Sequence, residues 1–241
     1  MAKGKNKGNM VSLIIGLGEV GSSLKKVLED YHTVYARDLE PVRVPKIDIM
    51  HICLRYSSHF ETIVDDYAKQ YKPRLIDICT TVPPGTTSRI GRNAVHSTTR
   101  GLHPDLVKSI RTFVKHIGGQ EAREVAKYYE VAGIKTQTHS KPETTELAHI
   151  LSNSTYGINL IWADEMASIC RQYGVDYTQA VLAYNSTCNE GYFKLDHPSK
   201  YRMLLNPPQG KIGGHCVRQG AALIPEKYRT EMLNKLVMEK K

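Results

Sequence analysis

The sequence predicts an α/β fold in which an N-terminal domain built on a parallel β-sheet is followed by a mostly helical domain built on one long helix. Short apolar runs alternate with amphipathic stretches through the first 140 of the 241 residues, a pattern typical of a parallel sheet covered on both faces. A glycine-rich turn follows the first apolar run. After Lys141-Pro142, a stretch of about 31 residues without proline predicts a helix of roughly 45 Å.

Each expected strand of the first domain is a short apolar run bounded by turn residues. We expect strands at residues 11–15, 33–38, 47–54, 74–79, 93–97, 112–117 and 134–138. Helices are expected where apolar residues recur at helical spacing, at residues 22–30, 58–71 and 121–131. The sequence Pro83-Pro84-Gly85 ends the fourth strand.

The second half of the chain is expected to be helical. Apolar residues form a stripe along residues 143–173: Leu147, Ile150, Leu151, Ile158, Ile161, Trp162, Met166 and Ile169. Gly174 favours the end of this helix, and a further helix is expected at 176–184. The predicted organisation is a basic flexible arm (1–10), a sheet domain (11–140) and a helical dimerisation and substrate domain (141–241).

Composition favours a cytoplasmic protein without a metal, membrane or nucleic-acid partner. No apolar stretch reaches the ~20 residues that span a bilayer, and the basic N-terminus lacks the apolar segment of a secretory signal. The five cysteines have neither a disulfide-scaffold pattern nor zinc-site spacing. The net charge of +9 raises the question of nucleic acid, but no recognition motif is present, and anionic small molecules also account for the excess of cations.

The turn Gly16-Leu-Gly-Glu-Val-Gly21 lies between an expected strand and an expected helix, where a dinucleotide-binding fingerprint is found. Its glycines permit a tight turn and close approach of a pyrophosphate, as in a Rossmann-type domain. Asp38 follows about 20 residues later and favours NAD, although Arg37 could reach the additional phosphate of NADP. A turn that binds nothing is the alternative. The predicted cofactor residues are Gly16, Leu17, Gly18, Glu19, Val20, Gly21, Asp38, Arg55 and Thr81.

The turn Gly210-Lys-Ile-Gly-Gly-His-Cys216 carries a candidate nucleophile. A thiolate that attacks an aldehyde gives an adduct from which a nicotinamide can take a hydride, and the resulting thioester is then hydrolysed. A helix start and the neighbouring His215 and Arg218 would favour the thiolate of Cys216. An inert buried thiol is the alternative.

These two turns, together with Cys79-Thr-Thr-Val-Pro-Pro-Gly-Thr86 and Glu146-Leu-Ala-His-Ile-Leu-Ser-Asn153, resemble the UDP-glucose/GDP-mannose dehydrogenase family, in the same order and at similar spacing. The resemblance implies an NAD-binding domain, a helical domain that forms a homodimer, and two successive hydride transfers. It also implies that Thr81 holds a water or a hydroxyl near the nicotinamide, and that Asn153 donates to an oxyanion.

Three positions depart from the family pattern. His149 stands where the family has a lysine, and Gly220 where it has an aspartate. A family glutamate falls within the loop 97–100. His149 could act as a base or proton shuttle, or could simply pack at a domain junction. The chain also ends soon after Gly220, so the family's third domain is missing, and either a smaller substrate or a partner would compensate.

The predicted substrate contacts come from three places. Arg100 and His103, with His96, lie in a loop expected at the carboxyl edge of the sheet, where they would contact substrate or cap a turn. Gly213 and Gly214 precede the thiol. Arg202 matches a family arginine that reaches the sugar of a neighbouring subunit, which again indicates a homodimer.

The sequence therefore predicts an NAD-dependent oxidoreductase that acts on a sugar or sugar nucleotide, with Cys216 as nucleophile. Two alternatives stay open. One is a two-electron dehydrogenase or reductase in which His149 handles the proton. The other is a non-catalytic NAD-binding sensor or subunit.

Overall fold

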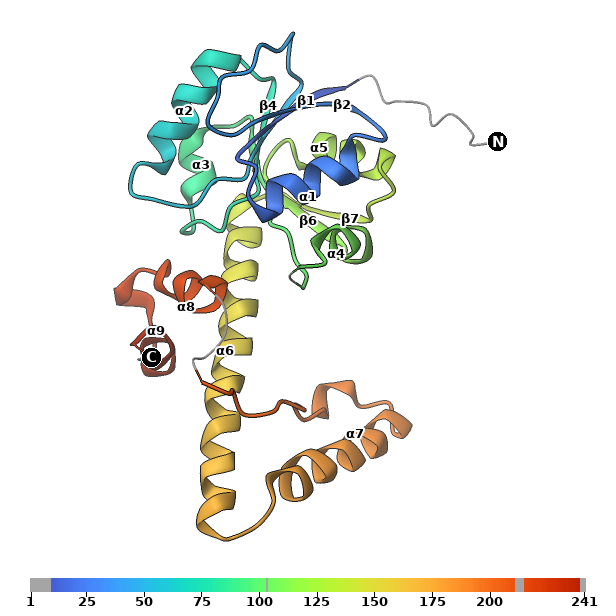
Figure 1. Cartoon of the computed structure of the whole chain (residues 1–241), viewed down its shortest axis with the longest axis vertical. Helices are drawn as coiled ribbons and strands as arrows, with labels where there is room; N and C mark the ends of the chain where they lie inside the picture. The colour runs from blue at the N-terminus through green and yellow to red at the C-terminus, as the bar shows by residue number, and fades with distance from the viewer. Residues whose placement is uncertain (1–9, 103, 211–214, 239–241) are drawn as a thin grey trace. The chain divides into compact units, whose positions relative to one another are not determined.

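The computed structural model describes residues 10–102, 104–210 and 215–238, with the side chains of His215 and Cys216 left out (Figure 1). The chain forms two compact units, Met1–His149 and Ile150–Lys241. The boundary falls within the long helix α6 (Pro142–Gln172), so the first turns of that helix belong to the first unit. No helix of these described ranges is long and apolar enough to cross a membrane.

The first unit is built on one seven-stranded sheet of order β2-β1-β3-β4-β5-β6-β7. Its strands are β1 (Val11–Ile15), β2 (Thr33–Arg37), β3 (Ile49–Ile52), β4 (Leu75–Ile78), β5 (Ala94–His96), β6 (Lys115–Gly118) and β7 (Thr136–His139). All neighbouring pairs are parallel except β5 and β6. The predicted fold class is thereby confirmed.

Five short helices accompany the sheet, and both faces carry an apolar core. The helices are α1 (Glu19–Leu28), α2 (Phe60–Tyr71), α3 (Thr86–Ile90), α4 (Leu106–Thr112) and α5 (Ala122–Val131). Helices α1, α4 and α5 bury their apolar residues with Ile14, whereas α2 and α3 pack with Leu13 and Ile15. Alternate residues of β1 thus face opposite cores, as the pleat of a strand requires.

The antiparallel position of β6 differs from the expected all-parallel pairing, and the strand predicted at 112–117 begins only at Lys115. Residues 106–112 instead form α4, whose Leu106 and Ile110 are buried. To pair parallel with β5, strand β6 would need a crossover connection that carries the chain back to the amino edge of the sheet. Because the connection through α4 ends at the carboxyl edge of β5, strand β6 starts there and runs back along β5.

The second unit is helical. Beyond α6 it contains the π-helix η1 (Thr178–Ala183), α7 (Tyr184–Lys194), the 3₁₀ turns η2 (Pro198–Lys200) and η3 (Glu226–Tyr228), α8 (His215–Ala222) and α9 (Glu231–Met238). A small core joins α6, α8 and α9 through Leu160, Val217 and Leu236. Gly157 permits this contact, since a Cβ there would lie 2.4 Å from Val217 Cγ1.

Candidate functional site

The glycine turn between β1 and α1 has the geometry of a phosphate cradle. Gly16 has φ of +90°, and a Cβ there would lie 2.8 Å from the carbonyl oxygen of Cys53. A Cβ on Gly21 would lie 1.9 Å from the carbonyl oxygen of Gly16. Gly18, by contrast, has no protein atom within 4 Å of its Cβ position. The outer two glycines are therefore required by the fold, while the middle one leaves the backbone open to a ligand, as a dinucleotide fingerprint requires.

The side chains at the end of β2 are oriented by the turn and by α2. The amide of Leu17 donates to Oδ1 of Asp38 at 3.0 Å, so this exposed carboxylate lies beside the glycine turn. The Arg37 guanidinium donates to Gln70 and to Tyr71, both at 2.8 Å, and lies 4.9 Å from the ring centre of Tyr67. Arg37 is therefore held against α2, whereas the Asp38 carboxylate contacts the backbone of the turn.

The start of α6 is tied to the carboxyl edge of the sheet. The buried carboxylate of Glu146 accepts from the amides of Gly85 at 2.6 Å and Thr87 at 2.9 Å. The hydroxyl of Thr145 lies 2.8 Å from Nδ1 of His96, whose Nε2 lies 3.3 Å from the carbonyl oxygen of Thr80. Burial lowers the pKa of His96 to about 3, so this imidazole is neutral.

His149 is partly buried on α6, one turn after Thr145. Burial, followed by the charges of Arg100 and Lys115, lowers its pKa to about 4. A neutral imidazole at pH 7 can accept a proton, and the neighbouring cations would stabilise an anion formed beside it. His149 therefore has the charge state of a general base.

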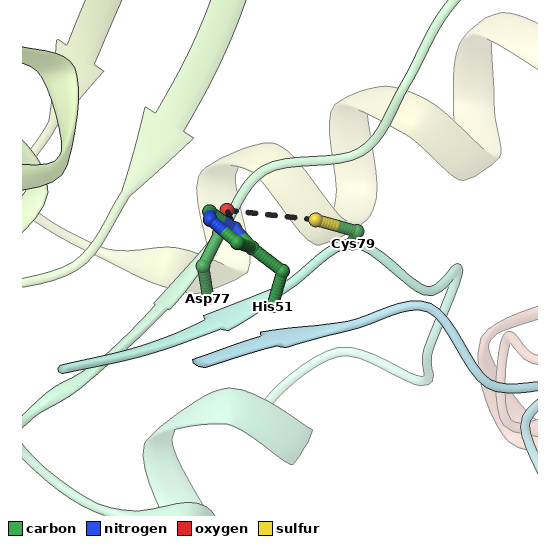
Figure 2. A group of neighbouring side chains, drawn as sticks. All are labelled: His51, Asp77 and Cys79. Atoms are coloured by element: carbon green, nitrogen blue, oxygen red, sulfur yellow. Dashed lines mark hydrogen bonds and ion pairs between the residues drawn. The ribbon is translucent and has the colours of Figure 1, made fainter. Parts of the chain in front are cut away.

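A charged network is buried beside this edge. His51 on β3 and Asp77 on β4 are register partners, and Nδ1 of His51 lies 2.8 Å from Oδ2 of Asp77. Figure 2 shows these two side chains converging with Cys79, whose Sγ donates to Asp77 at 3.5 Å. Tyr129 from α5 and Ser97, which follows β5, also donate to the Asp77 carboxylate.

Opposite charges hold this network in its ionised form. Burial would raise the pKa of Asp77, but the bond and charge of His51, with Lys115 and Ser97, hold it at about 2. Burial would likewise lower the pKa of His51, but Asp77 raises it to about 9. The ammonium of Lys115 donates to the carbonyl oxygen of Ser97 at 2.6 Å and lies 4.7 Å from the centre of the Tyr129 ring.

The ligand atoms of His51, Asp77 and Cys79 lie within 4.8 Å of one another, close enough for a metal ion. However, the Asp77 oxygens already accept from four donors, and Lys115 adds a positive charge beside them. This donor set fits a satisfied hydrogen-bond network better than a divalent cation.

The structure brings together part of the predicted site. Gly16, Leu17, Gly18, Glu19, Val20, Gly21 and Asp38 form one turn with its acid, and Thr81, Arg55 and Arg100 follow strands β4, β3 and β5. Asn153 lies one helical turn after His149, within the second unit. Arg202, also in that unit, is exposed and lies over the ring of Tyr192. His103, Gly213, Gly214 and the side chain of Cys216 lie outside the described residues.

Sequence reasoning missed Lys115 and the Asp77 network. A signal was present, since His51-Ile-Cys53 and Asp77-Ile-Cys79 repeat one pattern of polar residue, isoleucine and cysteine inside two apolar runs. Polar groups within buried strands need partners, and two such patterns at the ends of two strands indicate a shared network. Lys115 gave no comparable signal, because it is a single lysine within the strand expected at 112–117, with no repeated pattern around it.

Comparison with curated proteins finds UDP-N-acetyl-D-mannosamine dehydrogenases. The chain is 29% identical over 162 residues to the one from Methanococcus maripaludis, a match that covers 64% of the chain and 35% of that relative. It is 28% identical over 178 residues to the one from Methanocaldococcus jannaschii, which covers 68% and 38%. These matches span little more than a third of the length of the relatives. No family model matches the chain.

Solved structures share the fold at lower identity. The UDP-D-ManNAc dehydrogenase of Pyrococcus horikoshii superposes with a TM-score of 0.76 at 18% identity, covering 95% of this chain and 67% of that one. The 3-hydroxyisobutyrate dehydrogenase of Mycobacterium tuberculosis gives 0.69 at 12% identity, covering 95% and 92%. Together with the curated relatives, these matches confirm the resemblance to nucleotide-sugar dehydrogenases, and the solved structures show that this chain shares the fold of dehydrogenases.

The charge of Lys115 should contribute to the low pKa of His149, after burial and the charge of Arg100. In Lys115→Met, the pKa of His149 is expected to rise above about 4 but to stay below its ordinary value of 6.5, because one positive charge is removed while burial and the charge of Arg100 remain. The measurement is a titration of the histidine ring resonances by NMR, with His149→Gln to assign the signal. Lys108→Met on the exposed side of α4 is the control, and an unchanged midpoint in Lys115→Met would contradict the coupling.

The Asp77–His51 pair should stabilise the fold within a defined pH window. The lowered pKa of Asp77 gives stability that is present above about pH 4 and lost as pH falls through 2. The raised pKa of His51 gives stability that is present below 6.5 and lost as pH rises through about 9. Asp77→Asn is therefore expected to lower the free energy of unfolding by about 3 kcal/mol between pH 4 and 6.5.

The check is urea denaturation at several pH values, with the exposed Asp66→Asn on α2 as the control. The difference between wild type and Asp77→Asn should shrink as pH approaches 9. A difference that stays constant across this range would show that Asp77 acts without the charge of His51.

Proposed function

We propose that this protein is an NAD-dependent dehydrogenase that oxidises an alcohol of a sugar or sugar nucleotide. The observation that carries the proposal is the glycine turn, in which Gly16 and Gly21 are required by the fold and Gly18 is left open. Relatives at 28–29% identity are named as dehydrogenases of a UDP-sugar. We further propose the domain bounds 11–140 and 141–241, and a cytoplasmic location.

The residues around the turn fit NAD better than NADP. Asp38 lies beside the turn and can accept from both ribose hydroxyls, whereas it would repel a 2′-phosphate. Arg37 is engaged by Gln70 and Tyr71, away from the turn. The amides at the start of α1 would hold the pyrophosphate, and Arg55 and Thr81 would lie along the carboxyl edge of the sheet. When bound, NAD accepts the hydride that leaves the substrate carbon.

The proton of the substrate hydroxyl is assigned to His149. Its imidazole is neutral because burial, followed by the charges of Arg100 and Lys115, lowers its pKa. These cations would also stabilise the alkoxide that develops as the proton leaves. Asn153, one turn further along α6, would donate to the same oxygen, and Arg100, His103, Gly213, Gly214 and Arg202 would bind the substrate.

Cys216 is assigned as the nucleophile of a second oxidation on the strength of its Gly-Gly-His-Cys motif. The thiol would add to the aldehyde produced by the first step, and the resulting thiohemiacetal would lose a hydride to a second NAD to become a thioester. Hydrolysis of that thioester would release a carboxylate and restore the thiol. A two-electron dehydrogenase is the second candidate, and the neutral His149 favours it, since one base is sufficient for a single oxidation. We also propose a homodimer, supported by the apolar side chains of Leu151, Trp162 and Ile169, each about half exposed along α6.

Gly18→Val is expected to weaken NAD binding at least tenfold while leaving the fold intact. The new side chain meets no protein atom near its Cβ, but it occupies the side of the turn where the pyrophosphate approaches. Gly21→Ala is the contrasting variant, because its Cβ would collide with Gly16 and lower the melting temperature. Calorimetric titration with NAD and NADP measures the affinities. Unchanged NAD affinity in Gly18→Val would refute the assigned cradle.

The reaction is tested by incubating the protein with NAD and a panel of UDP- and GDP-sugars and counting NADH formed per product. We expect NADH formation that falls at least 100-fold in His149→Gln. Two equivalents per product that disappear in Cys216→Ala support the thiol mechanism. One equivalent retained in Cys216→Ala supports the two-electron reaction. NAD binding without reduction by any substrate would mean that the protein is a non-catalytic NAD-binding sensor or subunit.

A further inference from the structure

Two cysteines lie side by side beneath the glycine turn. Cys53 directly follows β3 and Cys79 directly follows β4, and the last register pair of these parallel strands is Ile52 with Ile78. Cys53 and Cys79 are therefore the next pair along. The amide of Cys79 donates to the carbonyl oxygen of Ile52 at 2.9 Å, which continues the pairing to this point. Both side chains pack into the same apolar core, the one shared with α1.

The two thiols differ in exposure. Cys53 is partly buried, whereas Cys79 is 5% exposed and donates its S–H to Asp77. The neighbouring Cys53 thiol, burial and the charge of Asp77 raise the pKa of Cys79 well above its ordinary value, so Cys79 is held as a thiol. Both cysteines are free, and Cys53 is the more accessible of the two.

We propose that Cys53 and Cys79 are an oxidisable dithiol, which a peroxide converts to a disulfide that weakens dinucleotide binding. Neighbouring strands place paired residues ~4.8 Å apart, within the ~4.4–6.8 Å between Cα atoms that a disulfide spans. The peroxide first oxidises Cys53 to a sulfenic acid and releases one water. The Cys79 sulfur then attacks the Cys53 sulfur, its proton leaves with the displaced hydroxyl as a second water, and the disulfide forms.

The surrounding network tolerates this bond. When Cys79 gives up its S–H, Asp77 still accepts from His51, Tyr129 and Ser97. The glycine turn between β1 and α1, in contrast, leaves little room for Cys53 to move. A Cβ on Gly16 would lie 2.8 Å from the carbonyl oxygen of Cys53, and a Cβ on Gly21 would lie 3.3 Å from Cβ of Cys53. A shift of Cys53 towards β4 therefore moves the backbone against which the glycine turn is packed.

The disulfide is tested by peptide mass spectrometry. The intact protein is treated with hydrogen peroxide, its free thiols are alkylated, and the chain is then digested with trypsin. Trypsin cuts after Lys46, Arg55, Arg74 and Arg89, so residues 47–55 and 75–89 form two peptides with one cysteine each. We expect these peptides to be linked, 2 hydrogens lighter than their sum, and released by dithiothreitol. The link should be absent in Cys53→Ser and retained in Cys188→Ser. Oxidation of Cys53 without the link would overturn the proposal.

The effect on the ligand rests on the proposed function and is measured separately, by calorimetric titration of NAD into reduced and oxidised protein. We expect the oxidised wild type to bind at least threefold more weakly, and Cys53→Ser to bind equally before and after peroxide. Equal affinity of both wild-type forms would overturn the coupling to the turn. If reduced wild type binds no NAD, the proposed function fails, while the peptide link still decides whether the dithiol exists.

Discussion

The buried carboxylate of Asp77 is the interaction on which the interior of the first unit depends. A carboxylate without solvent must be surrounded by donors, and here the donors come from β3, β4, the end of β5 and α5. Three of these donors, His51, Ser97 and Tyr129, lie 20 or more residues from Asp77 in the sequence, so satisfying Asp77 requires the correct strand register. The same requirement places Lys115 beside Ser97 and carries a positive charge to the carboxyl edge of the sheet.

The positive charge of Lys115 also acts on His149, the residue proposed to accept the substrate proton. Lys115 and Arg100, together with burial, keep His149 neutral, and a neutral imidazole flanked by cations suits the removal of a proton and the stabilisation of the oxygen left behind. Glu146 fixes the first turns of α6 by accepting from the amides at the start of α3, so His149 is held on a helix anchored to the sheet. Lys115 thus belongs both to the network around Asp77 and to the charges that lower the pKa of His149.

The glycine turn and the cysteine pair beneath it are joined by close packing. Gly16 and Gly21 allow β1, α1 and Cys53 to approach within distances that a Cβ would forbid. Any movement of Cys53 would therefore displace the backbone of the turn.

The curated relatives of this chain match it over little more than a third of their own length. The fold is shared more widely, including with a 3-hydroxyisobutyrate dehydrogenase of which the match covers 92%.

The sequence alone determined the strand and helix alternation, the glycine turn with Asp38, and the long helix α6, because each is a pattern of neighbouring residues. Periodicity shows which face of an element is buried, but not which residue of another element it meets. The reversal of β6, the three distant donors to Asp77 and the charge state of His149 were decided only by the tertiary structure. Each depends on residues tens of positions apart, whose proximity is set by strand register and by the return of the chain through α4.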